Sequence, residues 1–353
     1  MNYKHFLDLN DYSMNQVNEI IDLGLSIYTN PEKYMDTQKG KILATAFFEP
    51  STRTQLSFAA AMLRLGGQVI GFDNPDVLSV AKGETLTDTI KVVSQYADIL
   101  TMRHPLDGSA RAAASVSDIP VINAGDGEHL HPTQTLIDLV TIKKFKGEIE
   151  NLTIGLCGDL KYGRTVHSLI KILVEFSNIR FVLISTNELK LPEAFTEVLK
   201  NSGCKYTEVE SLSEALPDLD VLYMTRIQKE RFPSEFEYNQ QKDRYLLNFE
   251  KLTLAKPNLA ILHPLPRVDE IDTAVDADPR ALYFEQVKLG MYARMALITY
   301  ILNNKSEGID VFTSQETEKI CTNKNCITAH EKSLNQHFIT DGIVKYCEYC
   351  EHR

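Results

Sequence analysis

The chain has 353 residues, of which 43% are hydrophobic and 24% are charged, and its formal net charge is −11. This balance is typical of a globular protein with a sizeable core, and it excludes a disordered or fibrous chain. The excess of negative charge disfavours nucleic-acid binding, and the length indicates about two domains with a remainder. The longest nearly apolar segments are too short to span a bilayer and the N-terminus lacks the apolar segment of a secretory signal, so we expect a cytoplasmic protein.

Strand and helix patterns alternate over the first 302 residues. The hydrophobic pattern predicts strands at residues 42–48, 68–72, 98–102, 121–124, 152–157, 181–184, 205–209, 221–224 and 259–262. It predicts helices after a capping box at residues 13–16 and at residues 52–65, 87–97, 133–145, 164–176 and 284–302. This alternation predicts two parallel-sheet α/β lobes, at residues 1–147 and 148–283, with the helix at 284–302 packing back on the first lobe. Residues 303–318 are expected to be a linker to a small C-terminal domain at residues 319–353.

The loop after the first predicted strand carries Ser51, Thr52, Arg53 and Thr54. Ligands of parallel α/β sheets bind at the carboxyl ends of strands, where loops lead into helix N-termini. Three hydroxyl groups and a guanidinium at such a helix start are suited to a phosphate group. Taken alone, the segment fits an ordinary serine or threonine cap with a solvated arginine equally well.

Further polar side chains follow other predicted strands. Arg103, His131 and Gln134 belong to the same predicted sheet as Arg53, and together they offer donors for an oxyanion. Arg164 and Arg226 in the second lobe indicate a dianionic second substrate, because arginine binds carboxylates through two parallel hydrogen bonds. Residues 155–159 contain half of a dinucleotide fingerprint but lack its third glycine and its acidic residue, which argues against NAD.

Six motifs together resemble the catalytic chain of the aspartate carbamoyltransferase family, in order from residue 1 to about residue 302. They are STRT at 51–54, SVAKGET at 79–85, TMRHP at 101–105, HPTQ at 131–134, MTRIQKERF at 224–232 and HPLPR at 263–267. The resemblance implies the carbamoyltransferase fold and transfer of a carbamoyl group from carbamoyl phosphate to L-aspartate. The products would be N-carbamoyl-L-aspartate and phosphate, an early step of pyrimidine synthesis that needs no organic cofactor.

The resemblance also assigns roles to individual residues. It implies that the carbamoyl phosphate site contains Ser51, Thr52, Arg53, Thr54, Arg103, His131, Gln134, Leu265 and Pro266, with Ser79 and Lys82 donated by a neighbouring subunit of a homotrimer. Among these, the catalytic group is expected to be Arg53, Thr54, Arg103, His131 and Gln134. The aspartate site would contain Lys82, Arg164, Arg226, Gln228 and the main-chain carbonyl of Leu265.

Two other functions compete with this interpretation. Ornithine carbamoyltransferase shares the phosphate loop, but its substrate is cationic, and Arg226 would repel it. The motif at 263–266 is His-Pro-Leu-Pro, whereas the ornithine enzymes have His-Cys-Leu-Pro. A catalytically inactive scaffold is the non-enzymatic alternative, but it would not need so many converging cationic side chains.

The last 33 residues contain Cys321, Cys326, Cys347 and Cys350, two close pairs separated by 20 residues. This spacing favours one structural zinc ion held by four thiolates over disulfides, with reduced cysteines in a loose tail as the alternative. A zinc ribbon for nucleic acid is disfavoured, because residues 319–353 carry five cationic against four acidic side chains. We expect His330, His337 and His352 to lie at the surface.

The cysteine tail resembles the zinc-binding domain of the family's separate regulatory chain, so the chain is interpreted as a fusion protein. Only a short linker precedes the tail, where the regulatory chain has a nucleotide-binding domain, so nucleotide feedback through this chain is not expected. The tail is expected either to dock on its own or a neighbouring catalytic domain and stabilise the oligomer, or to recruit a separate regulatory subunit.

Overall fold

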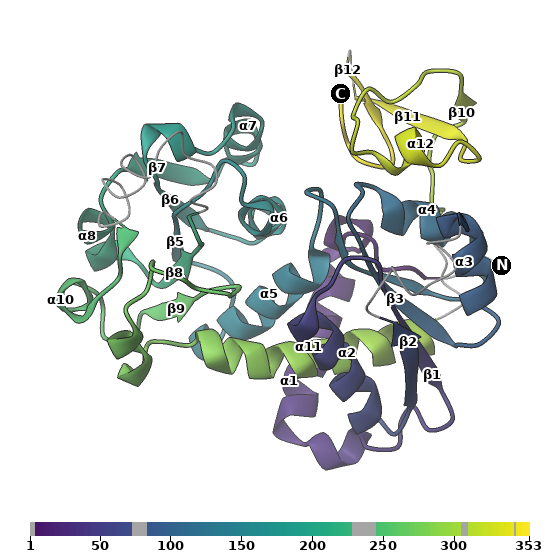
Figure 1. Ribbon diagram of the computed structural model, residues 1–353. Helices are drawn as coiled ribbons and strands as arrows, with labels where there is room; N and C mark the ends of the chain where they lie inside the picture. The colour runs from purple at the N-terminus through teal and green to yellow at the C-terminus, as the bar shows by residue number, and fades with distance from the viewer. Residues whose placement is uncertain (1–3, 73–82, 228–244, 305–309, 342–343) are drawn as a thin grey trace. The chain divides into compact units, whose positions relative to one another are not determined.

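The computed structural model describes residues 4–72, 83–227, 245–304, 310–341 and 344–353. The chain divides into two compact units, Met1–Leu136 with Gly290–Arg353, and Ile137–Leu289. Each unit is built on a parallel sheet, as the alternation of strands and helices predicts (Figure 1). Within the described part of the chain, no helix has the length and apolar character needed to cross a lipid bilayer.

The first unit contains a four-stranded parallel sheet in the order β2-β1-β3-β4. Its strands are β1 (Ile42–Phe47), β2 (Gln68–Phe72), β3 (Ile99–His104) and β4 (Val121–Asp126). Its helices are η1 (Leu9–Asp11), α1 (Met14–Thr29), η2 (Pro31–Tyr34), α2 (Thr52–Arg64), α3 (Leu86–Val93) and α4 (Ser109–Val116). Strands β1, β3 and β4 are buried along most of their length, whereas strand β2, at one edge, is largely exposed.

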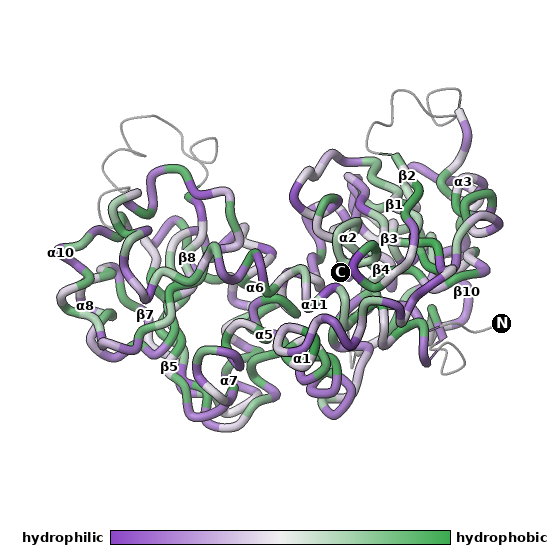
Figure 2. Tube along the Cα trace, turned by 90° about the horizontal axis from the view of Figure 1, so that it is seen from below, coloured by the Kyte–Doolittle hydropathy of each residue, from purple (hydrophilic) through white to green (hydrophobic). Residues whose placement is uncertain are grey.

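The second unit contains a five-stranded parallel sheet in the order β7-β6-β5-β8-β9. Its strands are β5 (Thr153–Cys157), β6 (Arg180–Ile184), β7 (Lys205–Val209), β8 (Val221–Met224) and β9 (Ala260–Leu262). Its helices are α6 (Arg164–Leu173), η5 (Asn187–Leu189), α7 (Glu193–Asn201), α8 (Leu212–Ala215), η6 (Leu216–Asp218), α10 (Phe249–Leu252) and η8 (Thr273–Ala277). Apolar side chains of β5, β6, β8 and β9 form its core, and hydrophobic stretches lie at the labels of β5 and β8 in Figure 2.

Two long helices contribute residues to both units. They are α5 (Pro132–Lys146) and α11 (Tyr283–Asn303), and the unit boundaries fall inside them. Both were expected from the sequence, at residues 133–145 and 284–302. The capping box at residues 13–16 is also confirmed, since Ser13 and Gln16 cap the start of α1 reciprocally.

The described residues from 310 onward form a small module, which we call the C-terminal module. It consists of β10 (Glu316–Thr317), α12 (Ile327–His330), β11 (Gln336–Asp341) and β12 (Val344–Cys347), with the three strands antiparallel. Strand β10 and Phe312 fall within the expected linker, yet β10 pairs with β11 and Phe312 stacks on His337 at 3.9 Å. The module therefore begins before residue 319.

Candidate active site and metal centre

In the first unit, the expected phosphate-binding loop follows β1, which lies between β2 and β3. The chain leaves β1 for β2 on one side and later reaches β3 on the other, so the loop lies at a switch point of the sheet, where α/β proteins bind ligands. Ser51 is the N-cap of α2, and its hydroxyl lies 3.0 Å from that of Thr54. The unpaired amides at the start of α2 give this loop a positive potential.

Arg53 and Arg103 lie close enough for their charges to interact. The pKa of Arg53 is lowered, first by partial burial and then by the positive charge of Arg103. Arg103 is buried, and its Nε atom lies 3.2 Å from the carboxylate of Glu49. Two neighbouring guanidinium groups at a helix N-terminus favour an anion between them.

His131 approaches Arg103 across Gly125, which sequence analysis did not single out. Gly125 has a φ of 124°, and a β-carbon there would lie 3.0 Å from Nη1 of Arg103 and 3.7 Å from Cδ2 of His131. The side chain of Asn123 accepts the N–H of Gly125 at 2.8 Å and donates to Asp126 at 3.0 Å, which holds this turn. A strand ending in Asn-Ala-Gly-Asp-Gly is the signal that could have identified the turn.

His131 and Gln134 stand at the start of α5. His131 is 8% exposed and precedes Pro132, the first residue of the helix, while the main-chain N–H of Gln134 donates to the carbonyl of His131 at 3.0 Å. The expected residues of the first lobe thus lie at or just after the carboxyl ends of three adjacent strands, β1, β3 and β4, with Arg103 near the end of β3. Arg103 and His131 are brought together here, as the sequence predicts.

In the second unit, the expected aspartate-binding residues follow β5, β8 and β9, which are also adjacent. Arg164 is the first residue of α6, and Arg226 lies two residues after β8. The chain after β5 passes close to the end of β8. The evidence is that a β-carbon on Gly158 would lie only 2.6 Å from the carbonyl oxygen of Thr225. Arg164 and Arg226 therefore emerge at the same edge of this sheet.

Leu265 and Pro266 follow β9 and are joined by a cis peptide bond. Leu265 has a φ of 55°, a left-handed conformation that a leucine rarely adopts. Of the expected site residues, Ser79, Lys82 and Gln228 lie outside the described residues.

The four cysteines of the C-terminal module form a compact buried cluster. The sulfur atoms of Cys321, Cys326, Cys347 and Cys350 all lie within 4.8 Å of one another, and all four cysteines are free of disulfides. Tetrahedral zinc with Zn–S distances of about 2.3 Å separates its sulfur ligands by about 3.8 Å. Sulfur separations of 3.6 Å between Cys321 and Cys350 and 3.9 Å between Cys326 and Cys347 match that geometry.

The three histidines near the cluster differ in exposure. His330 and His352 are exposed, as expected, but His337 is buried, so the expectation of a surface position for His337 is wrong. Its ring stacks on Phe312, and its Nδ1 atom lies 3.2 Å from the carbonyl oxygen of Ser314. His337 therefore holds the segment before β10 against the module.

The C-terminal module packs against the first lobe of its own chain, beside α3 and α4 (Figure 1). Asp107 donates its main-chain N–H to Asn325 at 3.0 Å, and its carbonyl accepts from Ile327 at 2.9 Å. One carboxylate oxygen of Asp107 accepts from the side chain of Asn323 at 2.9 Å. The four cysteines share an apolar core with side chains of β1, β3, α3 and α4.

Further hydrogen bonds join the module to α3 and α4. Glu331 accepts hydrogen bonds from the main-chain N–H of Leu86 and, at 3.0 Å, from the hydroxyl of Thr87. Arg111 donates to the carbonyl of Val311 at 2.6 Å. The module and the lobe are therefore joined by apolar packing and by directed hydrogen bonds.

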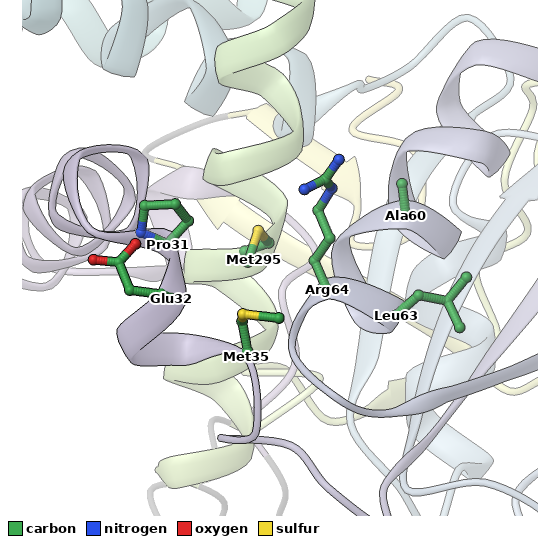
Figure 3. Close-up of a pocket in the computed structure, with 7 residues that line it drawn as sticks. All are labelled: Pro31, Glu32, Met35, Ala60, Leu63, Arg64 and Met295. Carbon is green, nitrogen blue, oxygen red and sulfur yellow. The ribbon is translucent and has the colours of Figure 1, made fainter.

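A cavity of about 560 Å³ lies elsewhere in the first unit (Figure 3). Its lining is mostly apolar and comes from η2, α2 and α11: Pro31, Glu32, Met35, Ala60, Leu63, Arg64 and Met295. None of the site residues expected from the sequence lines it. Leu63 and Met35 are 60% and 59% exposed, so this face presents large apolar side chains to solvent.

Comparison with known families accounts for both lobes. A family model described as the carbamoyl-P binding domain of aspartate/ornithine carbamoyltransferase matches residues 4–144. A second, described as the Asp/Orn binding domain of the same family, matches residues 150–301. Both matches end before the cysteine cluster.

The family models cover both aspartate and ornithine enzymes, whereas the similar relatives and solved structures described next are aspartate enzymes. The chain is 56% identical over 300 residues to the aspartate carbamoyltransferase catalytic subunit of Clostridium perfringens, covering 85% of this chain and 98% of that protein. It is similar to the catalytic subunit of M. jannaschii aspartate transcarbamoylase, with a TM-score of 0.82, 47% identity, and coverage of 86% and 99% of the two chains. A Trypanosoma cruzi aspartate transcarbamoylase, solved with carbamoyl phosphate and aspartate, aligns with a TM-score of 0.79 at 37% identity, covering 85% of this chain and 95% of that one. These matches span both lobes, and the chain belongs to the aspartate carbamoyltransferase family of transferases.

Proposed function

We propose that this chain transfers the carbamoyl group of carbamoyl phosphate to L-aspartate, giving N-carbamoyl-L-aspartate for pyrimidine synthesis, through the residues identified above. The observation that carries the proposal is that Arg103 and His131 lie together at Gly125. They accompany the start of α2, where residues 51–54 offer three hydroxyl groups and a guanidinium. The relatives named for this activity, and the Trypanosoma cruzi enzyme solved with both substrates, support the same substrates here.

The first lobe supplies the phosphate and oxyanion contacts in this proposal. Ser51, Thr52, Arg53 and Thr54 bind the phosphate through hydroxyl groups, a guanidinium and the amides at the start of α2. Arg103 and His131 donate to the carbonyl oxygen of the carbamoyl group, and Gln134 contacts its amide. These donors are fixed before the reaction, which is what stabilises charge that develops in the transition state.

The second lobe recognises aspartate. Arg164 and Arg226 bind its two carboxylates, and Gln228 assists Arg226, while the carbonyl of Leu265 accepts from the reacting amines. Two guanidinium groups in the acceptor site exclude the cationic side chain of ornithine by charge repulsion. The location of Arg164 and Arg226 after the adjacent strands β5 and β8 supports this assignment.

The reaction follows from these contacts without an organic cofactor. The neutral amine of aspartate attacks the carbamoyl carbon, a C–N bond forms, and the carbonyl oxygen becomes an oxyanion beside Arg53, Arg103 and His131. The C–O bond to phosphate then breaks, and the leaving phosphate accepts the proton that the amine loses. Each oxyanion donor in such a site contributes about 3–4 kcal/mol to lowering the barrier.

A direct assay tests the activity. The purified chain is incubated with carbamoyl phosphate and either L-aspartate or L-ornithine, and the carbamoylated products are quantified. We expect carbamoyl aspartate and no citrulline. Formation of citrulline at a comparable rate, or of neither product, contradicts the proposed function.

The proposed assembly is a homotrimer in which a neighbour supplies Ser79 and Lys82. Support comes from α2, where Leu56 and Leu63 are 63% and 60% exposed, and from the exposed edge strand β2. Exposed large apolar side chains on one helix are typical of a subunit interface. A second copy of this chain is the proposed occupant, and native mass measurement is the test.

The C-terminal module is proposed to bind one structural zinc ion and to dock on the first lobe of the same chain. Four buried thiolates at the observed sulfur separations suit zinc, which would supply the folding free energy that so small a module lacks. Contacts of Asp107, Arg111 and Glu331 support docking in cis over recruitment of a separate regulatory subunit. If removal of zinc by a chelator leaves melting and assembly unchanged, the stabilising role is refuted.

A further inference from the structure

A strained residue marks the loop after β9. Among the described residues, four that are not glycine have positive φ: Asn151, Asn178, Leu265 and Glu351. Asparagine tolerates this conformation, whereas leucine does not, because its β-carbon crowds the main chain. Such strain persists only where the surroundings hold it, and it is concentrated at functional loops.

The side chain of His263 is the direct support of Leu265. Its ring is 1% exposed, and its Nδ1 atom accepts the main-chain N–H of Leu265 at 2.7 Å. Because Nδ1 accepts, the hydrogen of the neutral ring must be on Nε2. Nε2 lies 2.7 Å from Oε1 of Glu270, which accepts that hydrogen.

Glu270 is a buried carboxylate with both oxygens occupied. Oε1 accepts from His263, and Oε2 accepts the main-chain N–H groups of Val268 and Asp269, each at 3.1 Å. Burial acts to raise the pKa of Glu270, but the hydrogen bonds from His263 and from the main chain outweigh it and lower the pKa. The ionised carboxylate has no hydrogen to donate, so it selects the ring form of His263 that carries its hydrogen on Nε2.

The main chain of His263 is anchored separately. Its N–H donates to Oε1 of Gln286 on α11 at 3.0 Å, and Nε2 of Gln286 donates to Asp138 on α5 at 2.7 Å. Gln286, which Asp138 orients, thus holds the main chain of His263, while Glu270 holds its ring.

A second His-Pro-Leu turn, at residues 104–106, gives an internal comparison. Nδ1 of His104 accepts the N–H of Leu106 at 3.1 Å, yet Leu106 is not among the residues with positive φ. The turn at 263–265 has a shorter contact, at 2.7 Å, and a carboxylate on the opposite nitrogen. Of the two turns, the one whose histidine is bonded to a carboxylate is also the one whose leucine has a positive φ.

We propose that Glu270, acting through His263, is a positioning residue that holds the main-chain carbonyl of Leu265 toward the reacting amines. This inference rests on the proposed function, in which that carbonyl is a substrate contact. Neither side chain touches the substrate. Their role is to fix one conformation of a main-chain group.

The substitution Glu270→Gln separates this role from simple packing. If the amide oxygen accepts from Val268 and Asp269, the amide nitrogen donates to Nε2 of His263, and the ring hydrogen moves to Nδ1. The N–H of Leu265 then loses its acceptor. If the amide turns the other way, its nitrogen faces two main-chain donors and those hydrogen bonds are lost. In both cases the support of the loop is broken although the size of the side chain is unchanged.

The experiment compares the wild type with Glu270→Gln and with Asp278→Asn, all in the full chain. Asp278 is a matched control, because its carboxylate is 9% exposed and pairs with Arg280 at 2.8 Å rather than with His263. We expect Glu270→Gln to lower kcat by about 10- to 100-fold, since small misplacements of a reacting contact have effects of this size. Binding of inorganic phosphate remains unchanged, and Asp278→Asn behaves as the wild type.

A spectroscopic measurement tests the link to His263 independently of turnover. In chains labelled with ¹⁵N-histidine, the wild type should have the His263 hydrogen on Nε2, and Glu270→Gln should move it to Nδ1. Equal kcat in Glu270→Gln and Asp278→Asn overturns the inference, whichever ring form the spectrum shows. A wild type with no carbamoyltransferase activity refutes the proposed function instead, and the histidine spectrum still decides whether Glu270 controls the ring.

A second pair of variants covers the case in which Glu270→Gln does not fold. An asparagine at 263 can accept the N–H two residues ahead, as asparagine does in turns, whereas a leucine cannot. We expect His263→Asn to retain at least about tenfold more turnover than His263→Leu, with both folded by circular dichroism. Equal turnover in the two variants contradicts the positioning role.

Discussion

Gly108 lies directly against the main chain of Tyr349. A β-carbon on Gly108 would lie 2.5 Å from the carbonyl oxygen of Tyr349, and Gly108 has a φ of 77°, which disfavours any other residue. This contact joins the start of α4 in the first lobe to the C-terminal module. The two main chains can approach this closely only because position 108 has no side chain.

The first prediction concerns that contact. Gly108→Ala should destabilise the docked module by roughly 1–3 kcal/mol, because it adds backbone strain and a clash with main-chain atoms. Gly147→Ala is the control, since Gly147 has a similar φ of 83° but nothing within 4 Å of its added carbon. Hydrogen exchange of the module measures the difference, and equal protection in both variants would show that the approach at 108 is not tight in solution.

Arg53 carries the second prediction. Arg53→Ala should lower turnover by at least about 100-fold while the chain stays folded, because it removes a guanidinium from the proposed phosphate and oxyanion site. Arg64→Ala, in the last turn of the same helix, is the matched control and should retain turnover. Steady-state kinetics and circular dichroism provide the measurements. Near-normal turnover of Arg53→Ala counts against the assignment of the site.

The third prediction addresses the metal. Cys326→Ser should abolish stoichiometric zinc binding and lower the melting temperature of the first lobe, since the cysteines share its apolar core. Cys204→Ser is the control, because Cys204 is a half-buried free cysteine outside the cluster. Metal analysis and calorimetry are the readouts. A zinc content that is equal in both variants would exclude the four-cysteine site.

A pH dependence follows from His129. Burial opposes a charge on this ring, but Asp126 at 3.2 Å and Glu351 at 3.7 Å raise its pKa to about 10. A pKa raised in the folded state gives stability that is complete below the unfolded value of about 6.5 and is lost as the pH rises to about 10. Stability should fall by up to about 1.4 kcal/mol per pH unit in this window.

His129→Gln is the variant that isolates this contribution. Urea unfolding of the zinc-loaded wild type and variant at pH 6, 8 and 10 should give a difference that shrinks as the pH rises. A difference that stays constant across this range would mean that the ring is neutral in the folded state.

The fifth prediction tests the assembly. Leu63→Asp should dissociate the proposed trimer, because it places a charge on the exposed apolar face of α2. Leu254→Asp is the control, since Leu254 is 47% exposed in the other unit. Light scattering on eluting protein gives the mass. A wild type that elutes as a monomer at assay concentration contradicts the assembly itself.

The sheet strands could be predicted from the sequence because their signal is local. Residues 68–72, 205–209 and 221–224 match β2, β7 and β8, since short apolar or β-branched segments between turn residues define strands. Helix α4 was not predicted, because it has only eight residues and begins after Gly108, which has a left-handed conformation and provides no side-chain cap. The start of α4 packs against Tyr349, which is far away in the chain, so no local sequence pattern could indicate this contact.

The candidate site residues were expected one by one from the sequence, whereas the residues that support them were not. Arg103 and His131 could be expected at one sheet edge because each follows a strand of the same sheet. Gly125 lets these two side chains approach, and Glu270 supports the Leu265 loop. Both were missed, because their roles depend on contacts in the folded chain that no sequence motif encodes. His337 was expected at the surface because four thiolates already saturate the metal, but it is buried against Phe312, in a segment that was expected to be a linker.

The C-terminal module is covalently attached to the lobe on which it docks. A separate zinc-binding subunit would leave its partner on dilution, at a rate and extent set by its own concentration. Here undocking is a unimolecular equilibrium, and a short tether keeps the effective local concentration near the millimolar range. The contacts of Asp107, Arg111 and Glu331 therefore hold equally well in scarce and abundant protein, and each lobe always has one module available.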